Sequence, residues 1–118
     1  MIELTVKNYL DSVLTVPVFM EKPEVAPVEY VLVEQTSERM ENQISFASVA
    51  IQSYAKRKYE AAQLIEEVKA AMKDIITLSD VTSCKLNNSY PFTDTSKKQY
   101  RYQAVFDLVF YDDLQEDN

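Results

Sequence analysis

The chain has 118 residues, 47% of them hydrophobic, and its 19 acidic and 12 basic side chains give a formal net charge of −7. This length suits one compact domain, residues 1–111, and the acidic residues 112–118 offer so little to bury that we expect them to fray. The negative charge repels phosphate backbones and anionic lipid headgroups, which disfavours sequence-specific nucleic-acid binding and membrane binding.

The first expected element is a short amphipathic helix of about two and a half turns, capped by Thr5 and ended by Pro17. Beyond it, residues 18–20 predict a brief extended piece. Pro23 and Pro27 then hold the chain extended over the surface, because proline fixes φ and lacks an N–H donor. The helix is indicated by apolar residues at steps of three and four: Val6, Tyr9, Leu10, Val13 and Leu14.

The next two segments predict a β-hairpin. Residues 28–35 are rich in β-branched and aromatic side chains, residues 36–42 are polar and predict the turn, and residues 43–52 predict the antiparallel partner. Alternation breaks in the second strand, where Ile44 and Phe46 share one face but Val49 and Ile51 share the other. Either a bulge near Ala47 and Ser48 restores the register, or both faces are covered there.

A long amphipathic helix is expected from Ser53 to Ile75, roughly 33 Å in length at about 1.5 Å per residue. Lys56 with Glu60, and Glu66 with Lys69, are spaced for weak surface pairs. One apolar stripe along this helix needs a sheet to cover, which makes the helix a lid. The stripe comprises Ala61, Leu64, Ile65, Val68, Ala71, Met72 and Ile75.

Two further strands complete the predicted fold, a weak one at residues 81–88 and a clear one at residues 99–111, joined by a polar connection at 88–98. We therefore expect an α+β fold in the order α-β-β-α-β-β, in which two helices pack on one face of a mainly antiparallel sheet of about four strands. The last strand places alternating apolar residues under the long helix: Tyr100, Tyr102, Ala104, Phe106, Leu108 and Phe110. The opposite face is mixed: Arg101, Gln103, Val105, Asp107, Val109 and Tyr111.

Histidine and glycine are absent, and Cys84 is the single cysteine. Without histidine the usual general base and commonest metal ligand are missing, and without glycine a Gly-rich phosphate loop cannot form. We expect no enzymatic activity, cofactor or metal, and Cys84 to be a half-buried strand residue rather than a nucleophile. One cysteine and no recognisable leader favour a reducing cytoplasm, and no apolar run is long enough to span a bilayer.

Two groups of surface residues are candidates for contact with a partner. Lys56, Arg57 and Lys58 place positive charge at the start of the long helix, where it opposes the macrodipole. We favour ordinary exposed surface over a partner contact for them, because exposed charges cost little free energy. Tyr90 and Phe92 lie in a polar segment, and aromatic side chains in such places often anchor a partner.

Three stretches cover nearly the whole chain and share an order and length with a known family: VPVFMEKPEVAPVEYVLVEQT at 16–36, ISFASVAIQSYAKRKYEAAQLIEEV at 44–68 and LNNSYPFTDTSKKQYRYQAVFDLVFY at 86–111. The chain resembles the tail terminator, or tail completion and head–tail joining, proteins of long-tailed bacteriophages, which also occur among the minor structural proteins of prophages. Members usually carry glycine after the first long strand, where this chain has Thr36, Ser37 and Glu38.

The resemblance implies a homo-oligomeric ring, a hexamer, that sits on a finished tail tube, stops its polymerisation and meets the head connector protein. Such a protein is made in the host bacterial cytoplasm and located at the head–tail junction of the virion. An acidic ring would also let DNA slide through without sticking. The expected subunit or partner interface residues are Glu38, Arg39, Glu41, Lys56, Arg57, Tyr90, Phe92, Asp94, Arg101, Gln103 and Tyr111.

Two other interpretations stay open. The chain could be a connector adaptor on the head side of the same junction, which binding to capsids rather than to tail tubes would indicate. It could instead be a regulatory module with a small-molecule pocket between helix and sheet, which a stable monomer and ligand-dependent melting would indicate.

Overall fold

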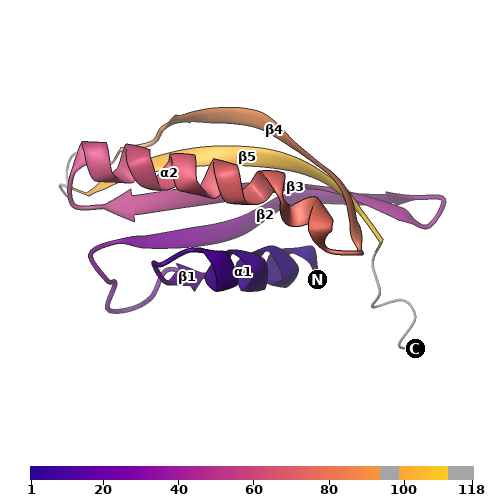
Figure 1. Ribbon diagram of the computed structural model, residues 1–118, viewed down its shortest axis with the longest axis horizontal. Helices are drawn as coiled ribbons and strands as arrows, with labels where there is room; N and C mark the ends of the chain where they lie inside the picture. Colours follow the sequence, from indigo (N-terminus) through magenta and orange to yellow (C-terminus); the bar gives the residue numbers. More distant parts are fainter. Residues whose placement is uncertain (94–98, 112–118) are drawn as a thin grey trace.

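The computed structural model describes residues 1–93 and 99–111, which form a five-stranded sheet with both helices on one face (Figure 1). The α+β class and the placement of the helices agree with the prediction. The predicted C-terminal tail, residues 112–118, lies outside the described residues, as does Asp94. In chain order the elements are α1 (Ile2–Val13), β1 (Val18–Phe19), β2 (Tyr30–Glu41), β3 (Ile44–Ala55), α2 (Lys58–Lys73), the 3-10 turn η1 (Ile75–Thr77), β4 (Val81–Pro91) and β5 (Tyr100–Phe110).

The sheet has the strand order β1-β2-β3-β5-β4 and is mixed rather than wholly antiparallel. The predicted extended piece forms β1, which pairs in parallel with β2, and the Val31 amide donates to the Pro17 carbonyl at 3.0 Å. The other neighbours are antiparallel. The prediction of about four strands therefore missed the two-residue edge strand, which is too short to show a periodicity.

The hairpin of β2 and β3 is longer than predicted, and the turn predicted at residues 36–42 is wrong. The chain reverses at Asn42 and Gln43, whose φ angles of 53° and 68° suit a tight turn between strands. The polar residues before them continue β2, because this end of the strand is exposed and needs no apolar side chains.

The hairpin contains one irregularity, between Gln35 and Ser37, where Thr36 is the extra residue. The bulge lies on β2, opposite Ser48 and Val49, and not on β3 as one alternative supposed. The second alternative is confirmed in part, because the last residues of β3 are buried on both faces. β3 itself contains no extra residue and pairs without interruption with β5.

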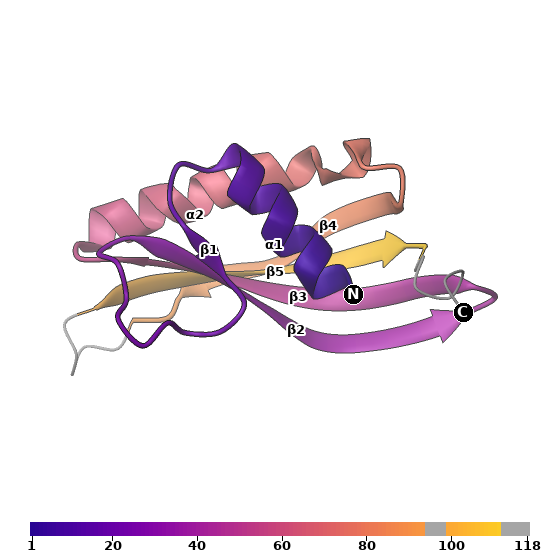
Figure 2. The same ribbon diagram turned by 90° about the horizontal axis from the view of Figure 1, so that it is seen from below.

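The two helices divide the sheet between them. α1 lies over β1 and β2, and α2 crosses β3 and β5 (Figure 2). α1 begins at Ile2 with Met1 as its N-cap, not at a Thr5 cap. α2 begins at Lys58 with Arg57 as its N-cap, because residues 53–55, predicted as helix, belong to β3. The buried Ser53 hydroxyl joins strand to helix by donating to the Ala61 carbonyl at 2.8 Å.

One apolar core lies between the sheet and both helices. The predicted apolar stripe of α2 and the inward face of β5 are confirmed as its main parts, and the predicted pair of Glu66 with Lys69 forms at 2.7 Å. β5 extends from Tyr100 to Phe110, and β4 continues to Pro91, past the predicted end at residue 88. The residues that β5 and α2 contribute to the core are Ala104, Phe106, Leu108, Phe110, Leu64, Ile65, Val68 and Met72.

Candidate interaction surface

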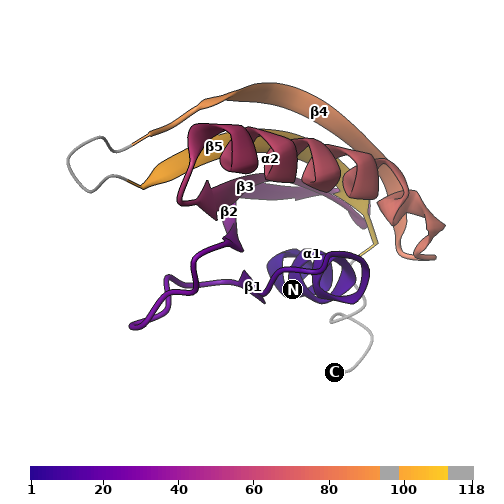
Figure 3. The same ribbon diagram turned by 60° about the vertical axis from the view of Figure 1, so that its left-hand side comes forward.

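The sheet face opposite the helices, called here the outer face, carries no helix among residues 1–93 and 99–111 (Figures 1 and 3). The mixed side chains predicted for β5 lie on this face, because they alternate with the core residues of that strand. The outer-face residues used below are Phe46, Ser48, Gln52, Tyr54, Arg101, Gln103, Asp107 and Val109.

Side-chain hydrogen bonds cross one half of the outer face. The Gln52 amide donates to the Gln103 side chain at 2.7 Å and accepts from the Tyr54 hydroxyl at 2.8 Å. Gln103 in turn donates to the Tyr90 hydroxyl at 2.5 Å. Tyr54 also stacks on Tyr30, with ring centroids 4.5 Å apart. The side chains of this half, called here the closed half, therefore contact one another in an ordered layer.

Arg101 anchors the rim of the same layer. Its guanidinium lies 4.1 Å from the Phe92 ring centroid, and its Nε donates to the Phe92 carbonyl. A second guanidinium nitrogen approaches the Tyr54 hydroxyl at 3.5 Å. The charge is therefore held against aromatic rings, and the exposed Tyr90 and Phe92 rings meet edge to face at 6.3 Å.

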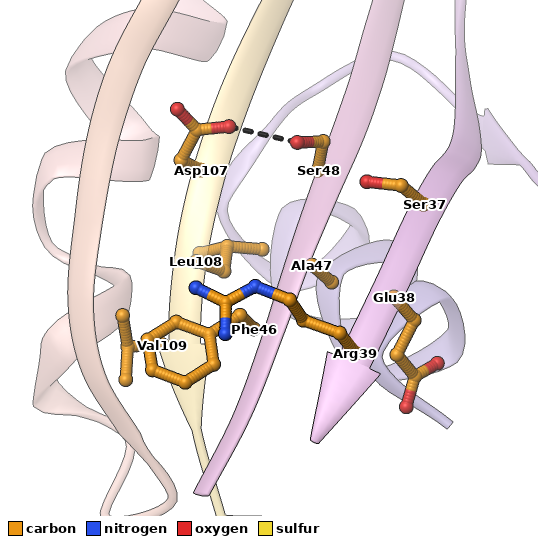
Figure 4. A pocket seen from close by; sticks show the side chains of 9 residues that line it. All are labelled: Ser37, Glu38, Arg39, Phe46, Ala47, Ser48, Asp107, Leu108 and Val109. Carbon is orange, nitrogen blue, oxygen red and sulfur yellow. Dashed lines mark hydrogen bonds between the residues drawn. The ribbon is translucent and has the colours of Figure 1, made fainter. Parts of the chain in front are cut away.

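The other half of the outer face contains an open pocket of about 360 Å³ near the hairpin (Figure 4). The Arg39 side chain reaches from β2 across β3, where its guanidinium lies 4.0 Å from the Phe46 ring centroid and pairs with Glu41 at 2.7 Å. The pocket is lined by Ser37, Glu38, Arg39, Phe46, Ala47, Ser48, Asp107, Leu108 and Val109.

Asp107 supplies the negative charge on the far side of this pocket. One carboxylate oxygen accepts a hydrogen bond from the Ser48 hydroxyl at 2.8 Å (Figure 4). The other accepts one from the Asn87 amide, also at 2.8 Å. The pocket therefore places a cation and a carboxylate on either side of an apolar floor that contains Phe46 and Val109. Such a pattern suits polar and apolar contact with another protein surface.

The predicted interface residues fall into separate groups. Tyr90, Phe92, Arg101 and Gln103 meet in the closed half of the outer face, and Glu38, Arg39 and Glu41 lie together on the hairpin.

The basic pair Lys56 and Arg57 lies in the connection between β3 and α2, at the opposite end of β3 from the hairpin. Tyr111 lies beyond the end of β5, where its amide donates to the Asp80 carbonyl at 2.8 Å. These residues therefore do not make one continuous site.

A second hollow, called here the α2–β4 groove, lies between helix and sheet, where the small-molecule alternative expects a pocket, but no lining residue was named in advance. It encloses about 520 Å³, and Leu86 on its floor is 49% exposed. Burial, and then the nearby Asp107 charge, raises the pKa of Cys84 to about 11, so its thiol is neutral and adds to the apolar lining. The groove is lined by Glu66, Lys69, Ala70, Met72, Lys73, Cys84, Leu86 and Phe106.

Sequence reasoning missed the pocket because it treated residues 36–42 as a turn, which hid the pairing of Arg39 with Phe46. It could not assign residues to the groove, because strand order cannot be deduced from periodicity. The weak apolar alternation of β4 could have indicated the groove. An edge strand that the helix leaves partly uncovered needs few apolar residues.

No helix formed by the described residues is long and apolar enough to cross a membrane. Within residues 1–93 and 99–111, no three Cys, Asp or Glu side chains lie together as metal ligands would. A scan against protein-family models found no match, and a search of curated proteins found none with significant similarity.

Proposed function

We propose that this chain is a non-enzymatic structural protein of a long-tailed bacteriophage or prophage. In this proposal it caps the tail tube, ends tube polymerisation and joins the tube to the head connector at the head–tail junction of the virion. The sequence resemblance motivates the assignment. The observation that carries it is the open outer face, where Arg39, Phe46 and Asp107 present charge and apolar surface that no helix or strand formed by residues 1–93 and 99–111 covers.

The chemistry of the chain supports a role in contact rather than in catalysis. The single cysteine is a poor nucleophile at neutral pH, because its pKa is raised to about 11. Asp107 is held by two hydrogen bonds from neighbouring side chains, and the chain has no histidine to act as a general base. Function then depends on which surfaces fit a partner.

Assembly into a ring, a hexamer by the resemblance, would use two different surfaces of each copy. The sheet ends in two unlike edges, with β1 at one side and β4 at the other, and the outer face lies between them. Unlike surfaces suit head-to-tail contacts, which close into rings when the rotation between copies permits. The partners in this proposal are other copies of the chain, the tail tube protein and the head connector protein.

Mixing experiments test the assignment against the connector alternative. Purified protein is incubated separately with tail tubes and with DNA-filled, tailless capsids of the same phage, and bound protein is measured after sedimentation. We expect co-sedimentation with tubes and rings at tube ends in electron micrographs. Binding to capsids alone would support the head-side adaptor, and binding to neither would contradict both.

The α2–β4 groove favours one further candidate function, a small-molecule-binding or regulatory module. Its volume of about 520 Å³ falls within the range of roughly 300–1,000 Å³ that ligand sites occupy. Thermal melting against a library of small apolar carboxylates and amphiphiles tests this directly. A stable monomer whose Tm rises with one of these compounds would favour the module over the structural role.

A further inference from the structure

α2 covers the inner face of β4 less than it covers the inner faces of β3 and β5. α2 packs mainly over β3 and β5, so Leu86 and Cys84 on β4 line an open groove instead of joining the closed core. The rim of this groove carries Lys69 and Lys73 against one acidic residue, Glu66. The α2–β4 groove therefore offers an apolar floor with a net positive rim.

The opposite edge of the molecule carries a complementary feature. Residues 20–29, called here the proline loop, project from the sheet between β1 and β2 (Figures 1 and 3). Val25 is 88% exposed and Val28 is 68% exposed, so two valines face solvent in one short loop. Three glutamates against one lysine make the loop acidic: Glu21, Glu24, Glu29 and Lys22.

We infer that the proline loop of one copy occupies the α2–β4 groove of the next copy. The valines would cover Leu86 and Cys84, and the loop glutamates would meet Lys69 and Lys73, so both apolar burial and charge favour the contact. Pro23 and Pro27 restrict the loop in advance, which lowers the conformational entropy lost on binding.

The geometry makes this contact head-to-tail. The loop leaves beside β1 and the groove is walled by β4, and these are the two outermost strands of the sheet. A copy that donates its loop at one edge keeps its own groove free at the other, so the contact can repeat from copy to copy. The inference rests on the ring assembly proposed above and names the surfaces that would form it.

The lone cysteine provides a direct test, because Cys84 already lies in the groove. Val25→Cys places a second thiol at the tip of the proline loop, and oxidation with copper phenanthroline at pH 9 traps close thiol pairs as disulfides. Disulfide formation collects even a weak complex, with a Kd of about 1 mM, as a covalent product. The full chain can therefore be tested alone, without a tail tube to stabilise the assembly. Non-reducing gels then report covalent species.

With Val25→Cys we expect a ladder that extends past the dimer, because each copy carries one donor and one acceptor thiol. Ser12→Cys, on the exposed end of α1, is the matched control and should show no such ladder. Val25→Cys combined with Cys84→Ser should stay monomeric. If Val25→Cys gives no more cross-linked product than the Ser12→Cys control, the inference is overturned. Dimers of Val25→Cys in the Cys84→Ser background would also overturn it, because they would show that loops pair with loops.

Charge exchange supplies a second test of the same contact, read out as the yield of the same disulfide ladder. In the Val25→Cys background, Lys69→Glu with Lys73→Glu should lower the ladder yield at least about tenfold, and Glu21→Lys with Glu24→Lys should do the same. Combining both sets should restore it, whereas no restoration would contradict the charge match. Tube binding is measured separately, so a ladder without tube binding would reject the phage role but keep the interface.

Discussion

The Glu3 carboxylate accepts a hydrogen bond from the backbone amide of Gln35 at 2.8 Å, which joins the first turn of α1 to the edge of β2. β1 pairs with β2 only at Val31 and Leu32, so the rest of that edge has no strand neighbour among the described residues. A carboxylate thus takes the place of the carbonyl that a further strand would offer. The contact both holds α1 in place and protects an exposed edge.

Glu3→Ala should lower the free energy of unfolding by about 1–3 kcal/mol, because a part-buried amide loses its charged acceptor. Glu3→Gln keeps an acceptor oxygen at the same distance and should lose less than half as much. Urea denaturation followed by circular dichroism measures both. Equal stability of Glu3→Ala and the wild type would show that the hydrogen bond contributes nothing.

Ser45 and Ser53 form a matched pair for a second stability measurement. Both are fully buried on β3, but the Ser45 hydroxyl has no hydrogen-bond partner among the described residues, whereas the Ser53 hydroxyl donates to Ala61. Ser53→Ala should therefore cost about 1 kcal/mol, while Ser45→Ala should be neutral or stabilise the fold. A reversed order in urea denaturation would contradict this account of the two serines.

The pKa of Cys84, raised to about 11 from 9.0, predicts slow thiol chemistry. Two pKa units correspond to about 100-fold less thiolate near pH 8, so iodoacetamide should react about 100-fold more slowly than with an exposed thiol. The rate should keep rising until the pH passes about 11. The introduced thiol of Ser12→Cys in a Cys84→Ser background serves as the exposed reference.

Alkaline pH should also weaken the fold. Burial raises the pKa of Tyr9, of Tyr30 and of Cys84, and each group is neutral when protonated. Their contribution to stability is therefore complete below the ordinary pKa values of 9.0 for Cys and 10.0 for Tyr, and it falls as the pH rises through the higher folded values. Urea midpoints between pH 7 and 11 measure this decline, and Cys84→Ala should make it begin at higher pH.

Substitutions in the pocket on the outer face should reduce binding to tail tubes without lowering the stability of the fold. Arg39→Gln and Phe46→Ala each remove part of the pocket wall, and each should weaken binding to tail tubes at least about tenfold with little change in Tm. Lys7→Gln removes a similar charge from the helix side of the molecule and should leave binding unchanged. Equal loss in all three variants would mean that overall charge, not this surface, controls binding.

The helices and strands with a strong hydrophobic periodicity could be predicted from the sequence. Features that depend on which strands pair, and in which register, could not. The alternation in β5 and the apolar stripe of α2 correctly placed Phe106 and Val68 in the core. The hairpin turn at Asn42 and Gln43 contains no glycine, and an exposed strand end has no apolar alternation to reveal it. Tyr90 and Arg101 were found as candidates, but that Arg101 would lie against Phe92 depends on the strand register, which no single sequence pattern contains.

Tail tube growth offers the most direct measurement of the central claim that this protein works by fitting its surfaces onto a tube end. Purified tail tube protein of the same phage is polymerised with increasing amounts of the chain, and tube lengths are measured by electron microscopy. We expect growth to stop in proportion to added protein, with rings at the arrested ends, and Arg39→Gln to be a weaker inhibitor. Tubes of unchanged length, with no rings at any concentration, would contradict the account.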